Sequence, residues 1–61
     1  MHPNLAKYRA ERGLTQQQAA DLLGVSRPHY ALIEVERKRP SVELAKKIGS
    51  LYGFAWASFF E

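Results

Sequence analysis

Residues Thr15–Glu34 read TQQQAADLLGVSRPHYALIE, and this stretch predicts two short helices separated by a tight turn. Thr15 is a favourable N-cap, and Gln18, three residues later, completes the pattern of a capping box. Gly24 is expected to end the first helix, because glycine adopts the left-handed conformation without a steric cost. Ala19, Ala20, Leu22 and Leu23 are expected to give this helix an apolar side and a small-residue side, where the alanines let another helix approach closely.

The second helix is expected to span Arg27–Glu34, behind a cap at Ser26. Pro28 falls in its first turn, where the missing N–H of proline is tolerated. At about 100° per residue, Tyr30 and Ile33 share the face that would be buried, with the glutamate at its edge. The other face carries Pro28, Ala31 and Leu32.

A helix, a short turn that contains glycine and a second helix form the helix-turn-helix arrangement. The sequence here resembles the lambda-repressor-like, Cro-type (XRE-type) family of bacterial and phage regulators. The resemblance implies an all-α, compact five-helix bundle, with residues 1–61 as one DNA-binding domain, and it covers about Leu5 to Phe60. It is carried by Gly13-Leu14-Thr15-Gln16, Leu23-Gly24-Val25-Ser26-Arg27, Ile33-Glu34 and Arg39-Pro40-Ser41.

A helix before the central pair is expected to run from Leu5 to about Arg12, capped by Asn4 and ended by Gly13. The resemblance implies that Arg9 on this helix pairs with Glu34, which would tie the first helix to the third. The alternative is an arginine that is simply solvated on the helix surface.

A fourth helix is expected after the central pair, capped by Ser41 and ended by Gly53. Phe54–Phe60 is expected to form a short fifth helix, whose aromatic residues cover the core or form a dimer surface. All four glycines are thus assigned to helix ends. The buried stripe of the fourth helix is expected to consist of Leu44, Ile48 and Leu51.

The loop between the third and fourth helices departs from the family at Glu36, where a glycine is usual. Either the third helix ends by a different route, or Glu36 accepts a left-handed conformation. This difference does not change the expected fold. It leaves the geometry of the loop undecided by the sequence.

Composition limits the possible classes. The chain has 61 residues, a net charge of +3, a pI of about 9.6 and no cysteine. It is expected to form one small domain without a disulfide or a thiolate metal site, in a reducing cytosol. We expect no signal peptide, because Met1-His2-Pro3-Asn4 has neither a basic start nor an apolar run, and no membrane span, because the longest apolar stretch is too short. The positive charge permits a polyanionic partner.

Catalysis has little support in the sequence. The six carboxylates form no spaced pair beside a nucleophile motif, and no phosphate-binding glycine loop is present. Of the two histidines, His2 and His29, the second is more typical of a helix surface than of a metal site. We therefore expect no enzyme activity, no cofactor and no metal.

The resemblance implies where DNA would be contacted. Gln16 would contact a phosphate and Gln17 a base edge, since an amide matches the N7 and N6 of adenine. Arg27 is the main candidate for specificity, as a bidentate donor to guanine O6 and N7. The cations after the third helix would bind phosphates, and a solvated turn is their alternative. The full expected set is Gln16, Gln17, Arg27, Pro28, His29, Ala31, Leu32, Arg37, Lys38 and Arg39.

The partner is expected to be double-stranded DNA, bound by a homodimer on a pseudo-palindromic operator, because two-fold pairing doubles the base contacts. The implied role is a transcriptional repressor or regulator, bacterial or phage-encoded, cytoplasmic and on the nucleoid when bound. The sequence does not indicate the operator, any effector, or whether the outcome is repression or activation. The expected dimer surface consists of Leu51, Tyr52, Trp56 and Phe60.

Two alternatives stay open. The middle of the third helix offers no side-chain hydrogen bonds to bases, so it would read thymine methyls or DNA shape, or it would hold a protein. If this helix holds a protein, the chain is an antitoxin-like interaction module that uses Pro28, Ala31, Leu32 and Val35. The other alternative is that the chain is the DNA-binding head of a longer regulator.

Overall fold

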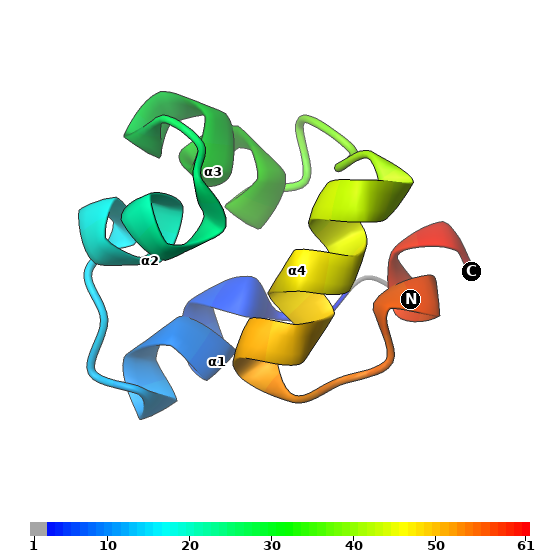
Figure 1. The fold of residues 1–61 in the computed structure, drawn as a ribbon, viewed down its shortest axis with the longest axis horizontal. Coiled ribbons are helices and arrows are strands. Elements are labelled where there is room, and N and C mark those ends of the chain that lie inside the picture. The colour runs from blue at the N-terminus through cyan, green and yellow to red at the C-terminus, as the bar shows by residue number, and fades with distance from the viewer. Residues whose placement is uncertain (1–2) are drawn as a thin grey trace.

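In the computed structural model, which describes residues 3–61, four α-helices precede a short 3-10 helix. Figure 1 shows α2 and α3 side by side at one end of the molecule, α4 through its middle, and η1 beside α4 at the other end. The whole measures 26 × 20 × 18 Å. The elements are α1 (Leu5–Glu11), α2 (Gln16–Leu23), α3 (Arg27–Glu34), α4 (Val42–Tyr52) and η1 (Trp56–Phe60).

Each α-helix begins at the cap that the sequence predicts. The side chains of Asn4, Thr15, Ser26 and Ser41 each accept a hydrogen bond from the backbone N–H three residues later. At Thr15 the capping box is complete, because Gln18 Oε1 also accepts from the Thr15 N–H at 2.9 Å. These caps satisfy N–H groups that would otherwise have no partner in the helix.

The core lies between α2, α3 and α4. Ala19 and Ala20 of α2 are fully buried, and their small side chains let the neighbouring helices approach closely. Leu23 is 3% exposed and joins them in the core, whereas Leu22 is 63% exposed and lies outside it. The buried apolar residues are Leu5, Ala19, Ala20, Leu23, Tyr30, Ile33, Leu44, Ala45, Ile48, Tyr52 and Phe59.

The predicted stripe of α4 is only partly the buried one. Leu44 and Ile48 are buried, whereas Leu51 is half-buried and Tyr52 beside it is 1% exposed. The Tyr52 hydroxyl lies 2.6 Å from the hydroxyl of Tyr30, so each ring keeps a polar partner inside the core. The expectation that Tyr52 forms a dimer surface is therefore wrong, because its side chain is enclosed within the chain itself.

Gly49 corrects the expectation that every glycine ends a helix. It lies within α4, where the chain leading into η1 crosses its backbone. A Cβ at this position would lie 2.7 Å from the Phe54 carbonyl oxygen and 3.1 Å from Trp56 Cβ. Glycine is thus required here by the close approach of two elements.

The expected fifth helix is the 3-10 helix η1 and not another α-helix. It has only five residues and no side-chain cap, which is too little to support an α-helical nucleus. Phe59 inserts into the core, while Trp56 and Phe60 pack against each other edge to face with centroids 6.1 Å apart. Packing of these rings holds η1 against α4.

Glu36 resolves the open point in the loop after α3. Its φ is 63°, so it adopts the left-handed conformation that the family usually assigns to glycine. The helix ends at Val35, and the N–H groups of Arg37 and Lys38 both donate to the Leu32 carbonyl, at 2.9 and 3.2 Å. Of the two expected routes for the end of the helix, the loop thus takes the one in which Glu36 is left-handed.

Within the described part of the chain, no helix is both long enough and apolar enough to span a membrane.

Candidate nucleic-acid interface

The turn between α2 and α3 brings the first residues of both helices together. Gly24 has a φ of 74°, and the Val25 N–H donates back to the Ala20 carbonyl at 3.0 Å, which reverses the chain tightly. As a result Arg27 Nη1 lies 3.3 Å from Gln16 Oε1 and donates a hydrogen bond to it. The two residues expected to contact a phosphate and a guanine are therefore direct neighbours.

Arg9 and Glu34 join α1 to the end of α3. Arg9 Nε lies 2.9 Å from Glu34 Oε2, and Arg9 Nη2 lies 3.1 Å from Glu34 Oε1, so the pair is bidentate. Arg9 Nη1 also donates to the Leu14 carbonyl at 2.9 Å. The structure thus brings together the two residues that the resemblance implies as a structural pair.

Glu34 is ionised despite its burial. Its side chain is 6% exposed, and burial by itself raises the pKa of a carboxyl. Hydrogen bonds from Arg9, Gln16 and Tyr30 outweigh that effect and hold the pKa of Glu34 below its usual range. The hydrogen bond to Glu34 raises the pKa of Arg9 in turn. Burial also raises the pKa of Tyr30, so its hydroxyl stays protonated and can donate.

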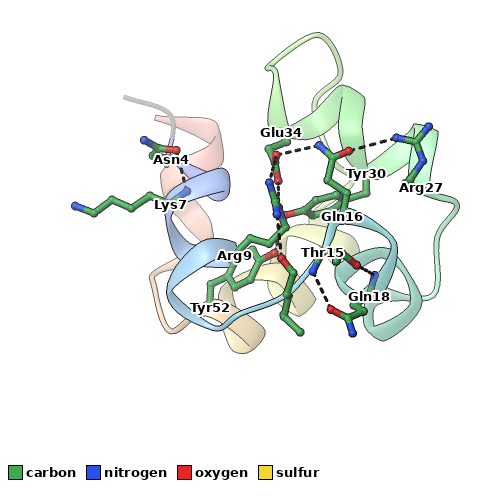
Figure 2. Close-up of polar contacts among 11 residues, drawn as sticks. Asn4, Lys7, Arg9, Thr15, Gln16, Gln18, Arg27, Tyr30, Glu34 and Tyr52 are labelled. Atoms are coloured by element: carbon green, nitrogen blue, oxygen red, sulfur yellow. Dashed lines mark hydrogen bonds and ion pairs between the residues drawn. The ribbon is translucent and has the colours of Figure 1, made fainter.

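A continuous line of polar contacts runs from Arg9 through Glu34 and Gln16 to Arg27 (Figure 2). Gln16 Nε2 donates to Glu34 Oε1 at 3.0 Å, and its Oε1 accepts from Arg27. This line was missed by sequence reasoning, which treated the pair and the DNA contacts as separate features. Its members lie up to 25 residues apart, so no local pattern indicates it.

The outer face of α3 carries the remaining expected base-facing residues. Arg27, Pro28 and Leu32 are exposed, and His29 and Ala31 are half-buried. Leu32 is 43% exposed, and Val35 just beyond the helix is 60% exposed. The face is therefore cationic at its start and apolar further along.

The cations after α3 do not share one environment. Arg37, Lys38 and Arg39 are all exposed. The Arg39 guanidinium, however, lies 5.7 Å from the centre of the Phe60 ring, as a cation–π contact that connects the loop to η1. Arg39 is therefore held towards the C-terminal element.

Gln17 lies one residue after Gln16 and is exposed. Its Nε2 donates to Asp21 Oδ1 at 2.8 Å, one turn further along α2. This contact is separate from the line of polar contacts that joins Glu34 to Arg27.

Among residues 3–61 no group of three or more histidine or carboxylate side chains could hold a metal ion. His2 lies outside the described residues.

Comparison with known proteins identifies the relatives of this chain. A family model described as helix-turn-helix matches residues 5–57. The uncharacterized HTH-type transcriptional regulator YqaF of Bacillus subtilis is 44% identical over 57 residues, which is 93% of this chain and 75% of YqaF. The uncharacterized HTH-type transcriptional regulator MJ0272 of Methanocaldococcus jannaschii is 43% identical over 53 residues, covering 87% of this chain and 80% of MJ0272.

A longer relative matches through one part of its length. The HTH-type transcriptional regulator PuuR of Escherichia coli is 30% identical over 56 residues, which is 92% of this chain but 30% of PuuR. No solved structure matches the chain.

Proposed function

This chain belongs to the helix-turn-helix family of DNA-binding transcriptional regulators, which are not enzymes, and we propose that it reads a specific DNA sequence with α3 in the major groove. The observation that carries the proposal is the placement of Arg27. It is exposed at the first turn of α3 and bonded to the first residue of α2. A guanidinium at this position matches the O6 and N7 acceptors of a guanine.

Phosphate contacts would fix the register of α3 on the duplex. Arg37 and Lys38 are exposed in the loop that follows α3, and Gln16 lies at the start of α2. Arg39 would add its charge from the side of η1. Such contacts contribute affinity that is independent of sequence and falls with salt.

The middle of α3 would read the duplex without hydrogen bonds. Ala31 and Leu32 present methyl groups, which suit the C5-methyl of thymine, and Pro28 adds apolar surface. His29 at the helix edge would contact a phosphate, and Gln17 would reach an adenine. We therefore propose narrow direct readout that depends mainly on Arg27 and Gln17.

We further propose that two copies bind a pseudo-palindromic operator as a repressor or regulator in the cytoplasm. Support comes from the aromatic pair of η1, the half-buried Trp56 and Phe60, which is 37% exposed. Leu51 of α4, which is half-buried, is the further proposed member of the dimer surface. Sedimentation would test pairing. Phe60→Lys should shift a dimer towards monomer, whereas Leu22→Lys, on the exposed side of α2, should not.

Selection of bound duplexes from a randomised library, at two salt concentrations, tests the function. The expected result is an enriched pseudo-palindrome whose half-sites lie about one helical turn apart and which survives the higher salt. Recovery of no motif, with binding lost at the higher salt, would contradict sequence-specific recognition.

A second candidate function uses the same face to hold a protein. It is favoured by the exposure of Leu32 and Val35, two large apolar side chains on adjoining turns. Leu32→Lys separates the two functions. If this face holds a protein, Leu32→Lys should abolish binding of that partner and leave DNA affinity unchanged or higher. If this face reads DNA, Leu32→Lys should instead remove the selection at one base pair.

A further inference from the structure

We propose that the buried carboxylate of Glu34 is a positioning group for base recognition, acting on Arg27 through the side-chain amide of Gln16. This inference rests on the proposed function, because it assigns to Arg27 the reading of a base. It adds that the direction of the Arg27 guanidinium is set from within the protein before DNA binds. The paired arginine and glutamate thereby gain a role beyond joining two helices.

The first step is the orientation of the Gln16 amide. Glu34 is ionised and can only accept hydrogen bonds, and it meets Gln16 at Nε2, at 3.0 Å. Arg27 can only donate, and it meets Gln16 at Oε1, at 3.3 Å. The reversed amide would place two acceptors together at Glu34 and two donors together at Arg27. Only one orientation of Gln16 therefore satisfies both neighbours.

The second step is the rigidity of Glu34 itself. Both of its carboxylate oxygens are bonded to Arg9, at 2.9 and 3.1 Å, and its side chain is 6% exposed. Arg9 is fixed in turn by its hydrogen bond to the Leu14 carbonyl. The line of contacts thus starts from a half-buried, charge-assisted ion pair, whose hydrogen bonds are of the strongest kind in the network.

The third step is what remains free on Arg27. Only Nη1 is bonded to Gln16, and a guanidinium has five N–H donors in a planar fork. The remaining donors can still make a bidentate contact with guanine. Because one nitrogen is already held, binding orders fewer side-chain rotamers, and the guanidinium favours one base position. Figure 2 shows Arg27 at the outer end of this line of contacts.

The test is a double-mutant cycle on Gln16 and Arg27, read as base preference and not as affinity alone. Gln16→Met keeps the length of the side chain and removes both hydrogen bonds. On the selected operator, the preference for the base read by Arg27 should fall about three- to tenfold in Gln16→Met. In the Arg27→Ala background, Gln16→Met should cause no further change in that preference.

Gln17→Met is the matched control, because it makes the same substitution one residue later at a side chain bonded only to Asp21 among the contacts described here. Because Gln17 is itself proposed to reach an adenine, Gln17→Met should lower the preference for that adenine and leave the preference at the Arg27 base unchanged. Glu34→Gln provides the second arm, since an amide at this position no longer dictates which end of Gln16 faces it. It should relax the same base as Gln16→Met, in protein shown by circular dichroism to be folded.

Two of the possible outcomes overturn the positioning role, and a third overturns the proposed function. If the wild-type protein selects a base at this position and Gln16→Met selects it equally well, the positioning role is wrong and the proposed function stands. The same holds if Gln16→Met weakens all sequences equally in both backgrounds, since Gln16 then contacts only phosphate. If the wild-type protein prefers no base at any position, the proposed function itself is wrong.

Discussion

Arg27 and Lys38 are both exposed cations near α3, but they lie at opposite ends of the helix and have different surroundings. Arg27 is bonded to Gln16 at the start of the helix. Lys38 is in the loop beyond the end of the helix, where its backbone N–H closes the turn onto Leu32. We expect the first to read a base and the second to bind a phosphate.

Replacing each by alanine separates these roles. Arg27→Ala should cost about 1–3 kcal/mol of binding free energy and relax specificity at one base pair. Lys38→Ala should weaken binding to all sequences about equally and reduce the salt slope by about one unit. Titrations of cognate and altered duplexes at several salt concentrations measure both. An equal loss on every sequence for Arg27→Ala would show that it does not read a base.

Glu36 stores conformational strain at the end of α3. A left-handed φ of 63° is unfavourable for any residue with a Cβ, yet the turn requires it. The strain lies next to the cationic loop that we assign to phosphate binding.

Glu36→Gly should therefore raise the free energy of unfolding, by about 0.5–1 kcal/mol, because glycine adopts this conformation without the steric cost. Glu36→Gln is the control, since it removes the charge and keeps the strain. Urea unfolding of the three proteins measures the difference. An equal stabilisation by both substitutions would assign the effect to the charge and not to the backbone.

At the scale of the elements, α4 is the helix against which both α1 and η1 pack. Arg12 of the α1 C-terminus donates to the carbonyls of Leu51 and Tyr52, at 3.2 and 2.7 Å, and so satisfies the end of α4. On the same helix, Gly49 lets the segment before η1 lie directly on the backbone. Helix α4 therefore connects the α2–α3 unit to the aromatic C-terminal element.

Gly49→Ala tests this packing. Its Cβ would lie 2.7 Å from a backbone oxygen, so η1 must move away from α4, and we expect a loss of about 1–3 kcal/mol in the free energy of unfolding. Ser50→Ala, at the exposed neighbouring position, should leave stability unchanged or slightly higher. Thermal unfolding compares the two. A Gly49→Ala protein as stable as Ser50→Ala would mean that η1 does not need this close approach.

At the scale of the whole molecule, side-chain polar contacts join helices that are distant in sequence. Arg9 and Glu34 connect α1 with α3, and the hydroxyls of Tyr30 and Tyr52 connect α3 with α4. A chain of 61 residues buries a limited core, so such contacts matter for both stability and the choice of one arrangement.

Stability should fall in acid through Glu34. Because its pKa in the folded state lies below that in the unfolded chain, about 4.3, the unfolded chain takes up a proton first as the pH falls. The stabilisation is complete above the unfolded pKa and is lost as the pH drops through the folded pKa. The advantage of the wild-type protein over Glu34→Gln should thus shrink between about pH 6 and about pH 3, in urea unfolding at each pH. A constant difference would exclude Glu34 as the titrating group.

The sequence by itself determined the helix starts, the glycine ends and the tight turn of the helix-turn-helix. These signals are local: Asn4, Thr15, Ser26 and Ser41 each cap an N–H only three residues away. The family resemblance added the pairing of Arg9 with Glu34, which no local pattern contains.

Only the tertiary structure decided how distant residues meet. The buried Tyr52, the close approach at Gly49 and the bond from Gln16 to Glu34 all depend on how the helices pack. Gln16 and Glu34 are 18 residues apart, and no rule of helix periodicity brings them within 3.0 Å. Their contact follows from the angle at which α2 and α3 pack, which the whole core sets.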